Sequence, residues 1–93
     1  MSNATGTTYT IVKVVRRGMR EPSYYEKTGT LQELCKAFQY TLEKGNSWAR
    51  KERRQVVSLR PRTVQKLVEN LNVAESNAAA NGYSSTGYYL KEV

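Results

Sequence analysis

Residues 9–16 read Tyr-Thr-Ile-Val-Lys-Val-Val-Arg, a run in which β-branched side chains predominate. Side chains alternate between the two faces of a strand, so Ile11 and Val12 point to opposite sides, and both sides are apolar. This run predicts a strand that is buried in large part on both faces. Residues 17–22 then supply turn formers, and residues 23–27 predict a shorter return strand. The start of the chain therefore predicts a β-hairpin.

A helix is expected next, because Thr30-Leu-Gln-Glu33 matches the capping box, in which the Thr30 hydroxyl and the Glu33 carboxylate each accept from a backbone amide. Its apolar residues recur at three- and four-residue spacing: Leu31, Leu34, Cys35, Phe38 and Leu42. Cys35 lies on this stripe and is interpreted as a small core residue. Lys44 suits the C-terminal end of the helix dipole, and Gly45 can adopt the left-handed conformation that ends a helix. We therefore expect the helix to stop at Gly45.

A second helix is predicted from Pro61, which suits a first helical turn, to the pair Asn81-Gly82. Its buried stripe comprises Val64, Leu67, Val68, Leu71, Ala74 and Ala78. Residues 83–93 predict a last strand, and residues 55–59 are compatible with a further short one. The predicted fold is α+β: a small, mainly antiparallel sheet of three or four strands with two helices packed on one face, in the order ββα(β)αβ.

The inventory of chemical groups argues against catalysis. The 93 residues include no histidine and no aspartate, so no Ser-His-Asp or Cys-His arrangement can form. A single cysteine cannot supply a zinc site or an internal disulfide, and it suits a reducing compartment. Neither a signal peptide nor a long apolar run is visible. We therefore expect a cytoplasmic protein that is not an enzyme and uses no cofactor, metal or membrane. Residues 9–93 should form a single domain after a flexible lead-in over residues 1–8.

Seven of the fifteen Lys and Arg lie in residues 46–66, NSWARKERRQVVSLRPRTVQK, beside one acid, Glu52, and the only tryptophan, Trp48. The net charge of +7 attracts polyanions. The plainer interpretation is a solvated basic loop with Trp48 packed in the core. The alternative is a binding site, because Arg offers a planar fork for phosphate and a large aromatic can stack on a base. Arg60 and Arg62 would then bind phosphates and Trp48 a base.

Arg16, Arg17 and Arg20 surround the predicted hairpin turn. One interpretation is that these cations keep an exposed sheet edge soluble. The other is that they converge with Arg60 and Arg62, so that the two groups of guanidiniums surround one anion site. The second interpretation depends on tertiary structure.

Other polar side chains are weaker candidates. Asn70 and Asn72 on the second predicted helix could read a ligand edge with their amides, although surface asparagines are usually only solvated. The seven tyrosines are typical of half-buried sheet positions. An RNA-recognition sheet would stack bases on aromatics, but its consensus run of basic, glycine and aromatic residues is absent.

Four local patterns are spread along residues 9–93: Tyr9-Thr-Ile-Val-Lys with a following Arg-Arg, Gly29-Thr-Leu-Gln-Glu-Leu, Tyr40-Thr-Leu-Glu-Lys-Gly-Asn-Ser-Trp48 and Arg60-Pro-Arg-Thr-Val-Gln-Lys-Leu67. This layout resembles small phage-encoded proteins, above all the phage anti-Thoeris sponges. Members of that family are not enzymes; they bind a cyclic ADP-ribose-type nucleotide at sites between subunits. The resemblance implies a homo-oligomer, with Trp48 on the base and Arg16, Arg17 and Arg20 as hairpin cations. Ser58 stands where the resemblance leads us to expect an amide side chain.

The leading hypothesis is a non-enzymatic phage anti-defence protein that binds and sequesters a small phosphorylated, cyclic nucleotide signal. Its predicted ligand-binding residues are Arg16, Arg17, Arg20, Trp48, Ser58, Arg60 and Arg62. The first alternative is a small basic protein that binds nucleic acid through the same surface. The second is a phage inhibitor that docks on an acidic face of a host defence protein such as a CRISPR effector.

Overall fold

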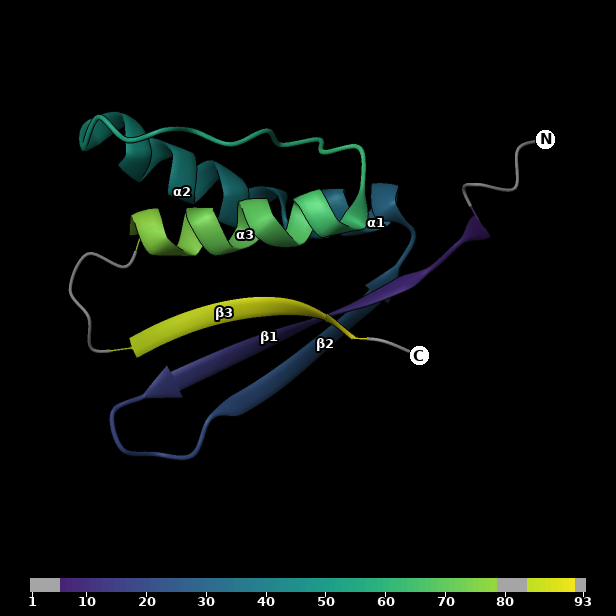
Figure 1. The fold of residues 1–93 in the computed structure, drawn as a ribbon, viewed down its shortest axis with the longest axis horizontal. Helices are drawn as coiled ribbons and strands as arrows, with labels where there is room; N and C mark the ends of the chain where they lie inside the picture. Colours follow the sequence, from purple (N-terminus) through teal and green to yellow (C-terminus); the bar gives the residue numbers. More distant parts are fainter. Residues whose placement is uncertain (1–5, 79–83, 92–93) are drawn as a thin grey trace.

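The structure, a computed structural model, describes residues 6–78 and 84–91 of the chain. Six elements follow one another: β1 (Tyr9–Arg17), β2 (Ser23–Gly29), α1 (Leu31–Ala37), α2 (Gln39–Lys51), α3 (Val64–Ala78) and β3 (Ser84–Lys91). The strands form one antiparallel sheet in the order β2-β1-β3, and the helices pack on one face of it (Figure 1). The predicted α+β fold is confirmed. The expected helix end at Asn81-Gly82 lies outside the described residues.

The hairpin places β1 in the centre of the sheet. Ile11 faces the helices and has no exposed surface, whereas Val12 lies on the opposite face and is only 2% exposed. β1 is therefore buried on both faces, as predicted, although the helices cover only one. The hairpin turns at Gly18, whose φ of 58° is in the left-handed region that favours glycine.

The predicted first helix consists of two helices. The capping box at Thr30 is confirmed: its hydroxyl accepts from the Glu33 N–H at 3.2 Å, and the Glu33 carboxylate accepts from the Thr30 N–H at 2.9 Å. α1 ends before Phe38, and α2 begins directly after it. The prediction that the helix stops at Gly45 is wrong, because α2 continues to Lys51.

Gly45 serves the packing of α2 against α3 instead of ending a helix. A Cβ at this position would lie 2.4 Å from the Cβ and 2.5 Å from the Cα of Ala74 in α3. The two helix backbones therefore approach each other as closely as they can at this crossing. A rule based on local sequence cannot show this, since Ala74 is far away along the chain.

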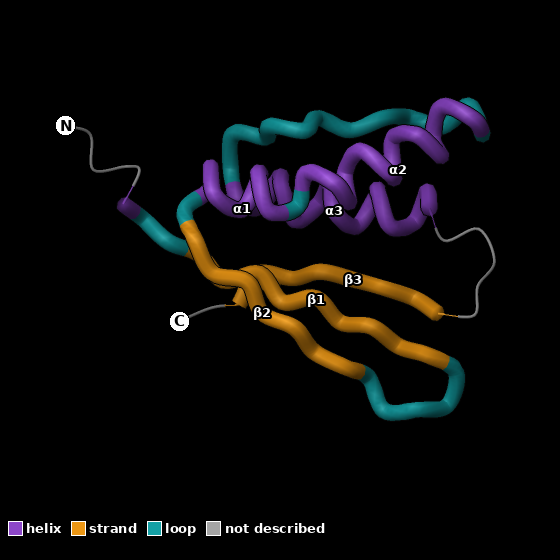
Figure 2. The backbone as a smooth tube through the Cα atoms, turned by 180° about the vertical axis from the view of Figure 1, so that it is seen from behind, coloured by secondary structure: helices purple, strands orange, loops and turns teal. Residues whose placement is uncertain are grey.

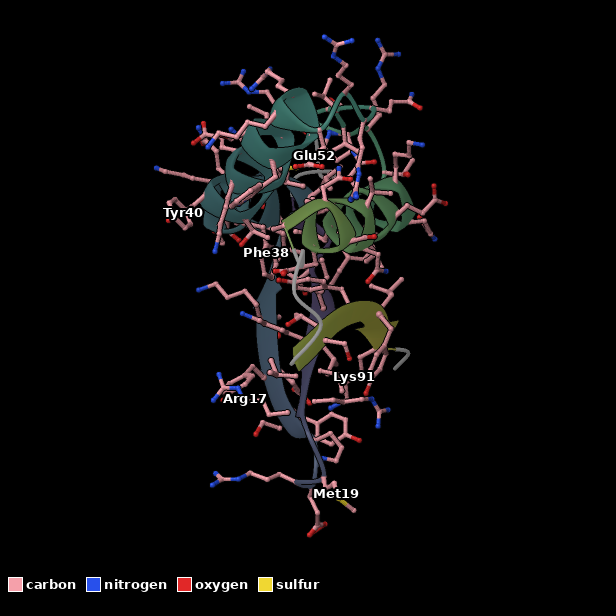
Figure 3. The ribbon with its side chains drawn as sticks, turned by 90° about the vertical axis from the view of Figure 1, so that its left-hand side faces the viewer. Arg17, Met19, Phe38, Tyr40, Glu52 and Lys91 are labelled. Atoms are coloured by element: carbon pink, nitrogen blue, oxygen red, sulfur yellow. The ribbon has the colours of Figure 1, made fainter. Side chains whose placement is uncertain are left out.

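The core fills the space between the sheet and the helices. Its largest fully buried side chains are Ile11, Leu34, Leu42, Leu67 and Leu71. Phe38 lies between the two layers (Figure 3) and meets Tyr88 edge-on, with ring centroids 5.7 Å apart. The Tyr88 hydroxyl donates to Glu75 of α3 at 2.9 Å. Burial, together with the neighbouring Glu75 carboxylate, raises the pKa of Tyr88 above its ordinary value, so the phenol stays protonated and ties β3 to α3.

After α2 the chain turns back along the side of the helices that faces away from the sheet (Figures 1 and 2). Arg53 makes the turn with a φ of 59°, and the Arg54 N–H donates to the Ala49 carbonyl at 2.7 Å. Residues 54–60, which we call the outer segment, form no strand. The further strand considered over residues 55–59 is therefore absent.

Asparagine side chains attach the outer segment to the helices. Asn46 of α2 donates to the carbonyl of Val57 at 2.9 Å and accepts from the Val57 N–H at 2.8 Å. Asn70 of α3 donates to the carbonyl of Ser58 at 3.1 Å. Both asparagines are buried, so these bonds satisfy polar groups that would otherwise be left without water. The outer segment thus forms a third layer without belonging to a sheet.

In the C-terminal half, two more side chains bind backbone groups. Asn72 of α3 donates to the carbonyl of Tyr88 at 3.0 Å and accepts from its N–H at 2.8 Å, so it occupies the free edge of β3. α3 begins at Val64 with Thr63 as its cap, whose hydroxyl accepts from the Lys66 N–H at 3.1 Å. Pro61 therefore lies before the helix and is buried there; the prediction that it opens the first turn is wrong.

Gly45→Ala should destabilise the protein. The added methyl would collide with the backbone and Cβ of Ala74, so we expect a loss of about 1–3 kcal/mol, measured by urea unfolding. Gly87→Ala in β3 is the control, since its Cβ would meet nothing closer than 3.8 Å. A gain in stability for Gly45→Ala, as expected for an uncrowded helical glycine, would show that α2 and α3 do not touch here.

Asn46→Ala should release the outer segment. It leaves the N–H and carbonyl of the half-buried Val57 without partners, at a cost of about 1–3 kcal/mol. Hydrogen exchange at the Val57 amide should accelerate by more than global unfolding explains. Lys44→Ala, on the exposed side of the same helix, is the control. Unchanged protection of Val57 in Asn46→Ala would mean that other contacts hold the segment.

Candidate functional site

The last residues of the outer segment lie against α1 and the start of α2. A cavity of about 600 Å³, which we call the α1 cavity, lies between the end of the outer segment and these helices. Its lining comprises Leu31, Gln32, Cys35, Lys36, Gln39, Leu59, Arg60 and Pro61. This volume lies within the range of small-molecule sites in proteins, roughly 300–1,000 Å³.

The approach of the outer segment to the cavity is fixed by short contacts. Asn70 binds the carbonyl of Ser58, and the Ser58 hydroxyl accepts from the Arg60 N–H at 3.1 Å. Pro61 is buried directly after Arg60, so the backbone on both sides of this cation is held. The Arg60 side chain itself remains exposed and free of acid partners among the described residues.

The chemistry of the lining is mixed. Lys36 and Arg60 supply two cations, and no carboxylate is among the lining residues. Gln32 and Gln39 add side-chain amides; the Gln39 amide nitrogen donates to Glu43 at 2.9 Å, which leaves its oxygen free to accept. The remaining wall is apolar. Such a lining can contact both an anionic group and a flat or aliphatic group.

Cys35 places a thiol in the cavity wall. Burial raises the pKa of Cys35 above its ordinary value, and the nearby positive charge of Arg60 opposes this rise in part. The thiol is therefore protonated at neutral pH and is a poor nucleophile. Cys35 was predicted as a core residue, and the structure shows it half-buried, in contact with the core on one side and the cavity on the other.

The predicted aromatic residue of the site lies elsewhere. Trp48 is half-buried on α2 and carries the ammonium of Lys51 5.0 Å above its ring. It does not line the α1 cavity. Ser58 does not line the cavity, but its hydroxyl accepts from the backbone N–H of Arg60, which does. Arg62 is exposed just beyond the buried Pro61 and is not a lining residue either.

The hairpin cations lie in a different region. Arg16, Arg17 and Arg20 are exposed at the free end of the sheet, whereas Arg60 lies against α1. Figure 3 shows Arg17 and Met19 at this end of the sheet, far from Glu52 at the end of α2. Within one chain the structure thus does not bring the two groups of guanidiniums together around Trp48.

Sequence reasoning missed most of the cavity. Gln32, Lys36 and Gln39 follow one another at four- and three-residue spacing, which placed them on one face of the predicted helix. That spacing alone does not indicate a site, because polar helix faces are usually solvated. Asn70 and Asn72, considered as ligand-reading amides, instead bind backbone groups of their own chain.

Comparisons with known proteins identify no relative. No family model matches the chain, and neither curated proteins nor solved structures give a significant match. Within residues 6–78 and 84–91, no three of the His, Cys, Asp and Glu side chains gather closely enough to hold a metal ion. In the same part of the chain, the helices are too short and too polar to span a bilayer.

Cys35 offers a direct test of the cavity's electrostatics. Because its pKa is raised, reaction with a disulfide reagent should rise with pH only above the range of an ordinary thiol. Arg60→Gln removes the charge that lowers this pKa, so the pH–rate profile should shift further toward high pH. Arg62→Gln, one residue past Pro61, should shift it less. A profile like that of free cysteine in the wild-type protein would contradict the burial of the thiol.

Proposed function

We propose that the protein binds a small phosphorylated nucleotide in the α1 cavity and sequesters it without converting it. The observation that carries this proposal is the lining itself: two cations, two amides and an apolar wall, with no carboxylate among the lining residues. Arg60 and Lys36 would bind the phosphates, since charge-assisted hydrogen bonds are roughly twice as strong as neutral ones. The apolar residues Leu31, Leu59 and Pro61 would pack against the ribose or base.

Specific recognition would come from the amides. Gln32 and Gln39 can each donate to and accept from the edge of a base, and the bond from Gln39 to Glu43 would orient its free oxygen. Arg62 follows Pro61 directly and supplies a further cation for a second phosphate beside the cavity. The net charge of +7 would raise the encounter rate with any such anion.

The resemblance to the phage anti-Thoeris sponges supports a cyclic ADP-ribose-type compound as the first ligand to test. It also supports a homo-oligomer, in which a second chain could bring the hairpin cations near the cavity of the first. In this proposal Arg60 and Arg62 are the predicted site residues that keep their roles. Trp48 would contribute only across subunits.

Calorimetry with cyclic ADP-ribose isomers and cyclic dinucleotides tests the proposal. Arg60→Ala and Lys36→Ala should each weaken binding about tenfold or more, because a hydrogen bond to a charged group contributes about 1.5–3 kcal/mol. Arg54→Ala is the matched control: it removes the same charge from the outer segment, away from the lining. A bound nucleotide should also slow the modification of Cys35. The proposal is refuted if none of these compounds gives heat on binding and none protects Cys35 from modification.

A further inference from the structure

The face of the sheet opposite the helices, which we call the open face, is uncovered by any described element (Figure 2). Alternation along the strands assigns to it Val12, Val14 and Arg16 of β1. β2 contributes Tyr24 and Glu26 to the same face, and β3 contributes Gly87 and Tyr89. It thus carries aromatic, apolar and cationic groups on a regular scaffold.

A hollow of about 430 Å³ lies at the hairpin end of the open face and extends around the edge of β3, where Asn72 of α3 also lines it. The register pairs Val14 with Tyr24 on one side and with Gly87 on the other, so the missing side chain of Gly87 leaves space beside Val14. Tyr24 and Tyr89 border this space and are 58% and 47% exposed. Arg16 borders it as well. The hollow shares no lining residue with the α1 cavity.

An ion pair lies at the end of the open face away from the hairpin turn. The Lys91 ammonium lies 3.0 Å from the Glu26 carboxylate, which joins the two edge strands across β1. The register places Val12, which is only 2% exposed, between Glu26 of this pair and Tyr89. Lys91 neutralises Glu26 at its end of the open face. At the hairpin end, Arg16 and Arg20 give a positive charge, which Glu21 opposes in part.

The two tyrosine rings suit a ligand with more than one flat group. Their strands are separated by β1 and their positions are offset by two residues, which puts the Cα atoms about 12 Å apart. Exposed tyrosines on a sheet can each stack one base, and stacking tolerates any sequence. A duplex hides its bases and cannot use such a surface. The apolar area, two valines and two tyrosines, is small for a stable dimer interface.

We propose that the open face binds single-stranded nucleic acid. Tyr24 and Tyr89 each stack a base, the space above Gly87 and Val14 admits the chain between them, and Arg16 binds a phosphate. This site is separate from the α1 cavity and does not depend on nucleotide binding there.

Fluorescence anisotropy with a labelled oligothymidylate, an oligouridylate and a duplex tests the proposal. Both single strands should bind at low salt, the duplex more weakly, and the two single strands distinguish DNA from RNA. Tyr24→Ala and Tyr89→Ala should each weaken binding about tenfold or more, whereas Tyr24→Phe should retain it. Gly87→Val adds a branched side chain at a position whose Cβ would meet nothing closer than 3.8 Å, and it should also abolish binding in a variant that melts like the wild type. Arg16→Ala should lower the salt dependence by about 0.7 in the slope of log K against log salt.

Two variants serve as matched controls. Tyr25→Ala removes a tyrosine of the same strand that is 57% exposed but belongs to the other face, and Arg54→Ala removes a charge from the outer segment. Neither should change affinity by more than a small factor. Circular dichroism and thermal melting confirm the fold of each variant.

Several outcomes would overturn the proposal. One is an absence of binding to either single strand at low salt, and another is equal affinity for the duplex. A third is that Arg54→Ala loses binding whereas Tyr24→Ala and Tyr89→Ala keep it. Self-association that disappears in Tyr24→Ala and Tyr89→Ala, without oligonucleotide binding, would assign the face to a second copy of the chain instead.

Discussion

The structure depends on asparagine side chains that pair with single peptide groups. Asn46 and Asn72 each donate to a carbonyl and accept from the N–H of the same residue, which reproduces the bond pattern of a neighbouring strand. Asn70 and Asn77 add donors seven residues apart on one face of α3. These amides fix stretches of backbone that no strand reaches. Because an unpaired buried peptide group is costly, each such residue specifies one position of the chain.

Both candidate surfaces follow from these bonds. Asn46 and Asn70 hold the outer segment, and the outer segment brings Arg60 and Pro61 against α1 to close the cavity. Asn72 occupies the edge of β3, so pairing with another strand is blocked there while the open face next to it stays accessible. The three described strands turn one face of the sheet to the helices and leave the other face uncovered by the described elements.

The sequence allowed prediction where the determinant is local. Strand alternation and the capping box at Thr30 depend on neighbouring residues, and both were found in the structure. Gly45 was misinterpreted because its requirement comes from Ala74 across a helix crossing. The outer segment has no local signal, since its partners are side chains on two helices. Within the site, Arg60 stood out through the density of cations, but its neighbours Lys36 and Gln32 depend on how α1 meets the outer segment.

Charge alone cannot select between the two surfaces. The molecule is a slab of 46 × 33 × 16 Å, so most of its cations are exposed on one side or the other instead of gathering in one pocket. A net charge of +7 on such a slab attracts every polyanion to every face. Discrimination must therefore come from short-range partners: amides and an apolar wall beside Arg60, and tyrosine rings beside Arg16. In the two proposals the same type of cation would bind a compact anion in one place and an extended strand in the other, because the neutral groups around it differ.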